Sequence, residues 1–227
     1  LKYLDSRLNK TMFIFIIAGV VLSTLHQSSL GTLMVIAGQK MHPLWQTPIL
    51  PLLFLLSAIA VGFAMIIFES LIASRSFKME PEMHILSSLG NMISPIIGVY
   101  LAFKIGDIFI RETFKYILIF DTTAWFFIAE MALLIIAFVM FLSRKVTASP
   151  LWLFIASSLV ISGVMLNRIN NFVIAYNPFY NDVKYVPSFG EISVTLGCIA
   201  LLVLIYRAVV MIFPVISQKR SEVIKKI

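Results

Sequence analysis

The sequence predicts an all-α, polytopic membrane protein built as a bundle of about six transmembrane helices. Three observations predict this fold class: 60% of the 227 residues are hydrophobic, only 13% are charged, and the mean hydropathy is +0.98. Soluble domains average about 45–50% apolar and about 25% charged residues. A soluble core cannot absorb this much apolar surface, so most of it must face lipid or other buried helices.

Six apolar runs are long enough to cross a bilayer, which requires about 20 residues of helix. In chain order the predicted spans are 12–38, 49–73, 85–105, 124–142, 151–175 and 192–213. The first and fifth runs carry polar residues in their later halves, so either helix could be tilted or continue past the membrane. No internal repeat or soluble domain interrupts the series, and residues 1–227 are predicted to form a single integral membrane domain.

Basic residues are distributed unequally between the two sets of loops. Eleven of the 18 Lys and Arg fall on the side of both termini, six fall on the other side, and Arg207 lies inside the last span. Because short loops rich in Lys and Arg stay in the cytoplasm, both termini are predicted to be cytoplasmic. The first group holds Lys2, Arg7, Lys10, Arg75, Lys78, Arg144, Lys145, Lys219, Arg220, Lys225 and Lys226, and the second holds Lys40, Lys104, Arg111, Lys115, Arg168 and Lys184.

Several functional classes are disfavoured by composition and motifs. The net charge of +7 is spread between the apolar runs, where topology and lipid head groups explain it, so nucleic acid is not an expected partner and membrane lipid is. The single Cys198 allows no internal disulfide and no cysteine-ligated iron–sulfur cluster. The sequence has no P-loop, GxGxxG, HExxH or GxSxG signature of a soluble enzyme, and no metal site is expected.

His26 is the first candidate for chemistry. It lies on a helix stripe with Gly19, Ser23 and Leu30, and the small residues of that stripe permit close helix packing. A histidine at membrane depth is costly and usually faces a bundle interior or a cavity. It could hydrogen-bond a quinone carbonyl or relay a proton. The structural alternative is a hydrogen bond between helices.

Glu130 and Arg168 are charged residues within the predicted spans. Glu130 lies about 9 Å along the fourth span, where a carboxyl group is a candidate for a proton path or for an ion pair with a neighbouring helix. Arg168 lies about 26 Å along the fifth span from Leu151, beside Asn167 and Asn171, which share a helix face. It could hold an acidic partner or a quinone oxygen, or it could snorkel to the membrane surface.

A b-type haem needs axial ligands at matching depth on facing helices. The three histidines are His26, His42 in the predicted outer loop, and His84 at the opposite end of the third span. No two of them lie at one depth on different spans, so no haem is expected in this chain.

Polar and aromatic residues gather on the predicted outer side, in the loop 41–48 and in the segment 167–191. Trp45 and the tyrosines there fit an ordinary aromatic belt at the membrane surface. Aromatic residues and Arg are also enriched at the cores of protein interfaces. The outer face is therefore predicted to be the functional face and to dock a partner.

Several sequence blocks together resemble one family. They are 24–31 (TLHQSSLG), 42–45 (HPLW), 167–168 (NR) followed by 175–178 (AYNP), and 187–191 (PSFGE). In order and spacing, they are similar to the NrfD / polysulfide-reductase membrane subunits, with the nearest likeness to the HybB-like branch found in nickel–iron hydrogenase complexes. The resemblance covers essentially the whole chain.

This resemblance implies a larger architecture. Such subunits have about ten transmembrane helices, and the present chain resembles the last six: the last helix of a first four-helix bundle, a complete second four-helix bundle and a final helix. The chain is then expected to be a fragment, or half of a split subunit whose four remaining helices lie on a separate chain.

The resemblance also implies a role in a respiratory complex in the inner membrane of a prokaryote. The expected function is to anchor a periplasmic, ferredoxin-like iron–sulfur subunit with its catalytic oxidoreductase subunits, a hydrogenase first among them, and to exchange electrons with menaquinone or another quinone. Expected contributors to quinone binding or proton transfer are His26, Gln27, Ser29, Arg168 and Glu130. Expected partner-docking residues are His42, Trp45, Asn171, Tyr176, Tyr180, Tyr185 and Glu191.

Two alternatives stay open. The chain could be a purely structural anchor with the quinone site on the missing helices. It could also be a transporter of ions or small solutes, although such proteins tend to show inverted repeats and helices broken at the midplane, and neither is evident here.

Overall fold

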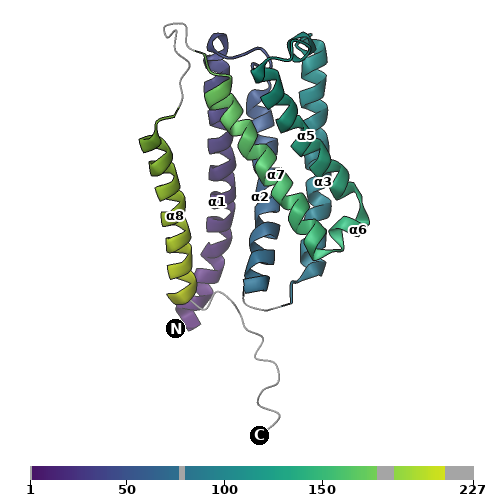
Figure 1. Cartoon of the computed structure of the whole chain (residues 1–227). Helices are drawn as coiled ribbons and strands as arrows, with labels where there is room; N and C mark the ends of the chain where they lie inside the picture. Colours follow the sequence, from purple (N-terminus) through teal and green to yellow (C-terminus); the bar gives the residue numbers. More distant parts are fainter. Residues whose placement is uncertain (1, 77–79, 178–186, 213–227) are drawn as a thin grey trace. The chain divides into compact units, whose positions relative to one another are not determined.

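The computed structural model describes residues 2–76, 80–177 and 187–212 (Figure 1). Every element of regular structure in those ranges is a helix, and six of them are long and apolar enough to cross a membrane. The predicted all-α fold class with six spans is therefore confirmed. The long helices are α1 Lys2–Ile36, α2 Leu50–Ser76, α3 Met83–Ile110, α5 Thr122–Leu142, α7 Pro150–Ile169 and α8 Phe189–Ile212, and the short ones are η1 Gly38–Lys40, α4 Phe114–Ile117, α6 Arg144–Thr147 and η2 Asn170–Ile174.

The helix ends differ from the predicted spans mainly where charged residues interrupt the apolar runs. α1 has 35 residues, about 52 Å of helix, so its polar first turns extend beyond an apolar core about 30 Å thick. α3 continues to Ile110, five residues past the predicted end. Asp107 and Arg111 form an ion pair across the last turn of α3, and pairs at this spacing support a helix rather than end it.

Helices α2, α3, α5 and α7 form a closed four-helix bundle in which α2 packs on α3, α3 on α5, α5 on α7, and α7 on α2. Of these four helices, α2 is the one against which α1 packs extensively. That contact is close because Gly31 has no side chain: a Cβ atom there would lie 2.8 Å from the Cα of Pro51. Figure 1 shows the bundle with α1 beside α2.

Prolines mark the starts of two helices. Pro150 is in the first turn of α7 and Pro51 is in the first turn of α2, positions where the missing N–H is not needed. Pro95 lies inside α3, where it removes one backbone hydrogen bond. Membrane helices tolerate this because neighbouring groups can satisfy the freed carbonyl.

The connection between α1 and α2 folds back over one end of the bundle. We call residues 37–49 the Trp45 loop and this end of the bundle the Trp45 end. The backbone N–H of His42 donates to the carbonyl of Ala175 at 2.8 Å, and the N–H of Asn177 donates to the carbonyl of Lys40 at 2.7 Å. The Arg111 guanidinium donates to the carbonyl of Pro43 at 3.2 Å. The loop is therefore tied to the residues that follow η2 and to the end of α3.

Residues 183–227 form a second compact unit, in which the structure describes α8. Ser188 and Glu191 cap its start: the Ser188 N–H donates to the Glu191 carboxylate at 2.8 Å, and the Glu191 N–H donates to the Ser188 hydroxyl at 3.3 Å. This is a capping box, which satisfies two backbone donors at a helix N-terminus.

Candidate functional site

The centre of the site is Glu130 on α5, whose side chain is fully buried inside the four-helix bundle (0% exposed). It forms an ion pair with Lys104 of α3, which is 6% exposed. Removing one partner of a buried ion pair leaves an uncompensated charge, so both groups need the other in place. The sequence-based alternatives for Glu130 were a proton path and an ion pair with a neighbouring helix, and the structure contains the ion pair.

Lys104 was counted among the loop residues of the outer side, and that interpretation is wrong. It lies six residues before the end of α3, about 9 Å below it. Its ammonium donates to the hydroxyl of Tyr100 at 3.3 Å and lies 5.2 Å from the ring centre of Phe127, close enough for a cation–π contact. One signal could have revealed it: a lysine inside a predicted span at a depth similar to that of Glu130.

Two asparagines of the α7–η2 segment complete the shell around the Glu130 carboxylate. Asn167 donates to one carboxylate oxygen and Asn170 donates to the other, each at 2.8 Å. Asn170 was not predicted. It begins the π-helical turn η2, and such turns change which residues share a helix face and are frequent at functional sites.

Asn171, which was predicted to share a face with Asn167, donates to its backbone carbonyl at 2.7 Å. The side-chain oxygens of Asn170 and Asn171 are buried and accept no hydrogen bond from the residues that the structure describes. Buried polar atoms usually find a partner, so these two oxygens leave unused acceptor capacity on the segment that carries Asn167.

Trp45 closes the site from the Trp45 loop. Its indole N–H donates to the Glu130 carboxylate at 3.0 Å, its ring packs edge-on against Phe127, and it is 1% exposed. The aromatic-belt interpretation is therefore wrong for Trp45. Its position in a loop with polar residues and two prolines concealed that the loop folds inward.

Arg168 lies beside the ion pair but does not touch it. Its guanidinium stacks on Phe54 at 3.7 Å from the ring centre, and it donates to the Phe54 carbonyl at 3.2 Å and to the Ser57 hydroxyl at 2.9 Å. It also donates to the side-chain oxygen of Asn167 at 2.8 Å. Arg168 therefore orients an asparagine that holds Glu130, and the described residues give it no acidic partner.

The site holds one carboxylate and two cations, since Arg168 and Lys104 both lie around Glu130. Three neutral N–H groups and one ammonium donate to the carboxylate. These donors stabilise its charged form in an otherwise apolar bundle. A cavity of about 10 Å³ adjoins Trp45, Lys104 and Asn167 and reaches Asp107. That volume is about the size of one water molecule. The arrangement can hold a buried negative charge, and the cavity lies between Asp107 and three residues that contact the Glu130 carboxylate.

The other predicted quinone-side residues lie on α1. His26 and Ser29 are exposed in this chain and Gln27 is half-buried. The Ser29 hydroxyl donates to the backbone carbonyl of His26 at 2.8 Å, and the Ser28 hydroxyl donates to the Pro51 carbonyl at 3.3 Å. Ser28 thus belongs to the contact with α2, whereas His26 does not join the Glu130 site.

The predicted docking residues have different environments. The His42 ring packs edge-on against Trp45 and Tyr116, and Tyr176 pairs with Met41 across an isolated bridge. Asn171 and Trp45 are buried, so neither side chain can touch a partner in this conformation. Glu191 caps α8, as described above. Tyr180 and Tyr185 lie outside the described residues.

Comparison with known proteins agrees with this architecture. The family model described as "Polysulphide reductase, NrfD" matches residues 3–180. One relative is the protein named "Probable Ni/Fe-hydrogenase 2 b-type cytochrome subunit" of Escherichia coli (strain K12), which is 30% identical over 95% of this chain and 56% of its own length. A protein of Nitratidesulfovibrio vulgaris is 31% identical over 92% of this chain and 56% of its own length. No solved structure is significantly similar to the chain.

The name of the first relative raises the question of a b-type haem. Two axial imidazoles at one depth on facing helices would be needed. His26 is exposed on α1, His42 is wedged between two aromatic rings in the Trp45 loop, and His84 begins α3 at the opposite end of the bundle. The three histidines of this chain do not fit such a pair, and the absence of haem from it stays a prediction.

The chain spans 56% of the length of each of these two relatives, about half of a full subunit. The family model covers most of the chain, including all four bundle helices and the Glu130 site. The chain is therefore a multi-pass membrane protein that belongs to the NrfD family of polysulphide reductase membrane subunits.

Proposed function

We propose that this chain is part of the membrane subunit of a respiratory oxidoreductase complex, in which it helps to exchange electrons between a periplasmic iron–sulfur subunit and a menaquinone-type quinone. The family membership supports the membrane-subunit role. The relative named as a Ni/Fe-hydrogenase subunit favours a hydrogenase as the catalytic partner. In this proposal both termini face the cytoplasm, and the Trp45 end faces the periplasm.

The observation that carries the proposal is the buried Glu130–Lys104 pair at the Trp45 end. Reduction of a quinone to a quinol takes up two electrons and two protons. The iron–sulfur partner supplies the electrons, and a protein group must supply or relay the protons. Glu130 is a titratable group inside the bundle, and intramembrane carboxyl groups mark proton relays.

Each group of the site has a proposed part in this step. Glu130 exchanges the proton, and Lys104 stabilises the ionised form. Trp45 and the asparagines 167 and 170 keep the carboxylate oriented through their hydrogen bonds. Arg168 holds Asn167 in place. With two cations around one carboxylate, the site carries an excess positive charge that favours a reduced, anionic quinone nearby.

The α1 surface that carries His26 and Gln27 is the proposed quinone side. In this proposal the helices that the chain lacks, relative to its family, cover that surface, whether they belong to a longer form of the chain or to a separate one. His42, Tyr176 and the neighbouring outer residues are the proposed docking surface for the iron–sulfur subunit, because aromatic residues are enriched at interface cores.

The proposal is tested in the intact complex with the double variant Lys104→Met/Glu130→Gln. It removes both members of the ion pair, so neither is left buried without the other, and we expect normal assembly. Quinone-linked turnover should fall by about 10²-fold, the scale of a lost acid–base group. Turnover with an artificial dye that bypasses the membrane subunit should not change. Glu69→Gln, an exposed carboxyl of α2, is the matched control and should turn over quinone normally.

Two outcomes favour the alternative functions. A double variant that assembles and still reduces quinone at the normal rate would make the chain a structural anchor, with the chemistry on other helices. Ion or solute uptake by vesicles that contain the chain without any redox partner, abolished by the same double variant, would support a transporter.

A further inference from the structure

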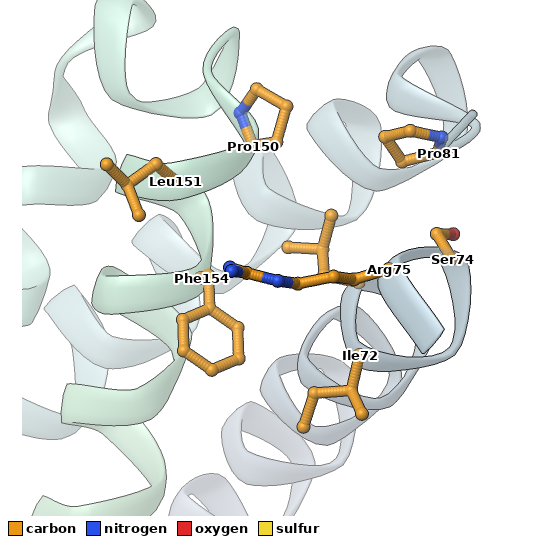
Figure 2. A pocket seen from close by; sticks show the side chains of 8 residues that line it. Ile72, Ser74, Arg75, Pro81, Pro150, Leu151 and Phe154 are labelled. Atoms are coloured by element: carbon orange, nitrogen blue, oxygen red, sulfur yellow. The ribbon is translucent and has the colours of Figure 1, made fainter. Parts of the chain in front are cut away.

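A second site lies at the opposite end of the bundle from Trp45. A pocket of about 310 Å³ opens between the end of α2, the segment before α3 and the start of α7. Figure 2 shows the side chain of Arg75 extending from α2 toward Phe154 of α7. The rest of the wall is nearly all apolar, and it includes Ile72, Leu151 and two prolines.

The depth of this pocket follows from helix length. Arg75 comes 25 residues after the first residue of α2, about 38 Å along the helix axis. The hydrocarbon core of a bilayer is about 30 Å thick. Because α2 begins at the Trp45 end of the bundle, Arg75 reaches the head-group region of the other leaflet. Ile72 and Phe154 line the part of the pocket that lies about one helical turn closer than Arg75 to the lipid acyl chains.

The wall combines a charged side chain, Arg75, with apolar side chains, so it suits an amphiphilic ligand. A guanidinium forms two parallel hydrogen bonds to a phosphate group, and no carboxylate among the described residues pairs with Arg75. The hydroxyl of Ser74 also lines the pocket and can donate to the same group. Glu80 and Glu82 flank Pro81 in the sequence, but only Pro81 contributes to the wall.

We infer that this pocket binds one anionic phospholipid, with its phosphate on Arg75 and the upper part of an acyl chain against Ile72 and Phe154. Basic pockets between transmembrane helices are a common form of lipid recognition. The volume lies at the small end of the range for ligand pockets, which suits a head group and the start of one chain rather than a whole lipid. This inference does not depend on the proposed redox function.

The test uses the full chain, stripped of lipid in detergent, and native mass spectrometry. The probes are short-chain phosphatidylglycerol, short-chain phosphatidylcholine and inorganic phosphate. We expect phosphatidylglycerol to bind most tightly and inorganic phosphate not to compete with it. Arg75→Gln should weaken phosphatidylglycerol binding about tenfold or more, the scale of one lost charged hydrogen bond. Helix content measured by circular dichroism should not change, since Arg75 is exposed.

Arg144→Gln is the matched control, because Arg144 is an exposed arginine at the same end of the bundle that does not line the pocket. It should leave binding within about twofold of the wild type. Equal losses of phosphatidylglycerol affinity in the two variants would overturn the inference, because binding would then depend on general surface charge. Competition by inorganic phosphate alone would make the site a simple anion site. Displacement of the lipid by a short-chain quinone would assign the pocket to quinone instead.

Discussion

The Lys104–Glu130 pair offers a double-mutant cycle whose magnitudes can be worked out from the structure. Lys104→Met leaves the Glu130 carboxylate with three neutral donors, from Trp45, Asn167 and Asn170. Glu130→Gln leaves the ammonium of Lys104 without a charged partner among the described residues, beside neutral groups such as the Tyr100 hydroxyl and two aromatic rings. Breaking a buried ion pair costs about 3–5 kcal/mol. We therefore expect about 3 kcal/mol for Lys104→Met and about 5 kcal/mol for Glu130→Gln.

The double variant should cost less than either single variant, because neither member of the pair is left without the other. The coupling energy is the sum of the two single costs minus the cost of the double variant, so it should be at least about 5 kcal/mol. Ordinary hydrogen bonds between membrane helices are worth far less, on average about 0.6 and at most about 1.7 kcal/mol. The size of the coupling therefore distinguishes a charged pair from a neutral hydrogen bond.

The assay is unfolding of the purified chain in mixed micelles as the fraction of a denaturing detergent is increased. Glu69→Gln, which removes an exposed carboxyl, should change the free energy of unfolding by no more than about 0.5 kcal/mol. A coupling energy below about 1 kcal/mol would refute the reasoning, because it would mean that Lys104 and Glu130 are neutral or solvated in the folded chain.

Three further predictions concern α1 and the topology. His26→Gln in the complex keeps a hydrogen-bond donor but no titratable ring, so quinone-linked turnover should fall about 10²-fold with normal assembly; intact turnover with reduced assembly would make His26 a packing residue. Gly31→Ala should destabilise the chain by about 1–3 kcal/mol through its clash with Pro51, whereas Gly19→Ala, with open space around it, should be neutral in the same unfolding assay. A reporter active only in the periplasm, fused after Ile227, should stay inactive, and activity there would reverse the proposed orientation.

The six spans could be predicted because hydropathy is summed over some 20 residues and tolerates local exceptions. The same averaging hides single polar residues within an apolar run, so it did not reveal the site. Lys104 lies within a predicted span, yet a basic residue near the end of an apolar run is usually a loop or snorkelling residue, so its burial was missed. Its pairing with Glu130 depends on how α3 packs against α5, which the sequence of either helix alone does not show.

Glu130 stands out in the sequence because a carboxyl group inside an apolar run is costly and therefore marks a candidate site. Trp45 and Asn170 could not be assigned in the same way. Trp45 reaches the carboxylate only because backbone hydrogen bonds tie its loop over the bundle. Asn170 reaches it because a π-helical turn changes the register after Ile169. Neither event leaves a periodic signal in the sequence.

The most direct test of the Glu130 assignment is the infrared difference spectrum of the complex between its oxidised and quinol-reduced states. If Glu130 exchanges a proton during quinone chemistry, the spectrum contains a carboxylic-acid C=O band that disappears in Glu130→Gln and is retained in Glu69→Gln. Identical spectra for the wild type and Glu130→Gln, in complexes that both bind quinone, would contradict a proton-transfer role and leave the Lys104–Glu130 pair as a structural element of the bundle.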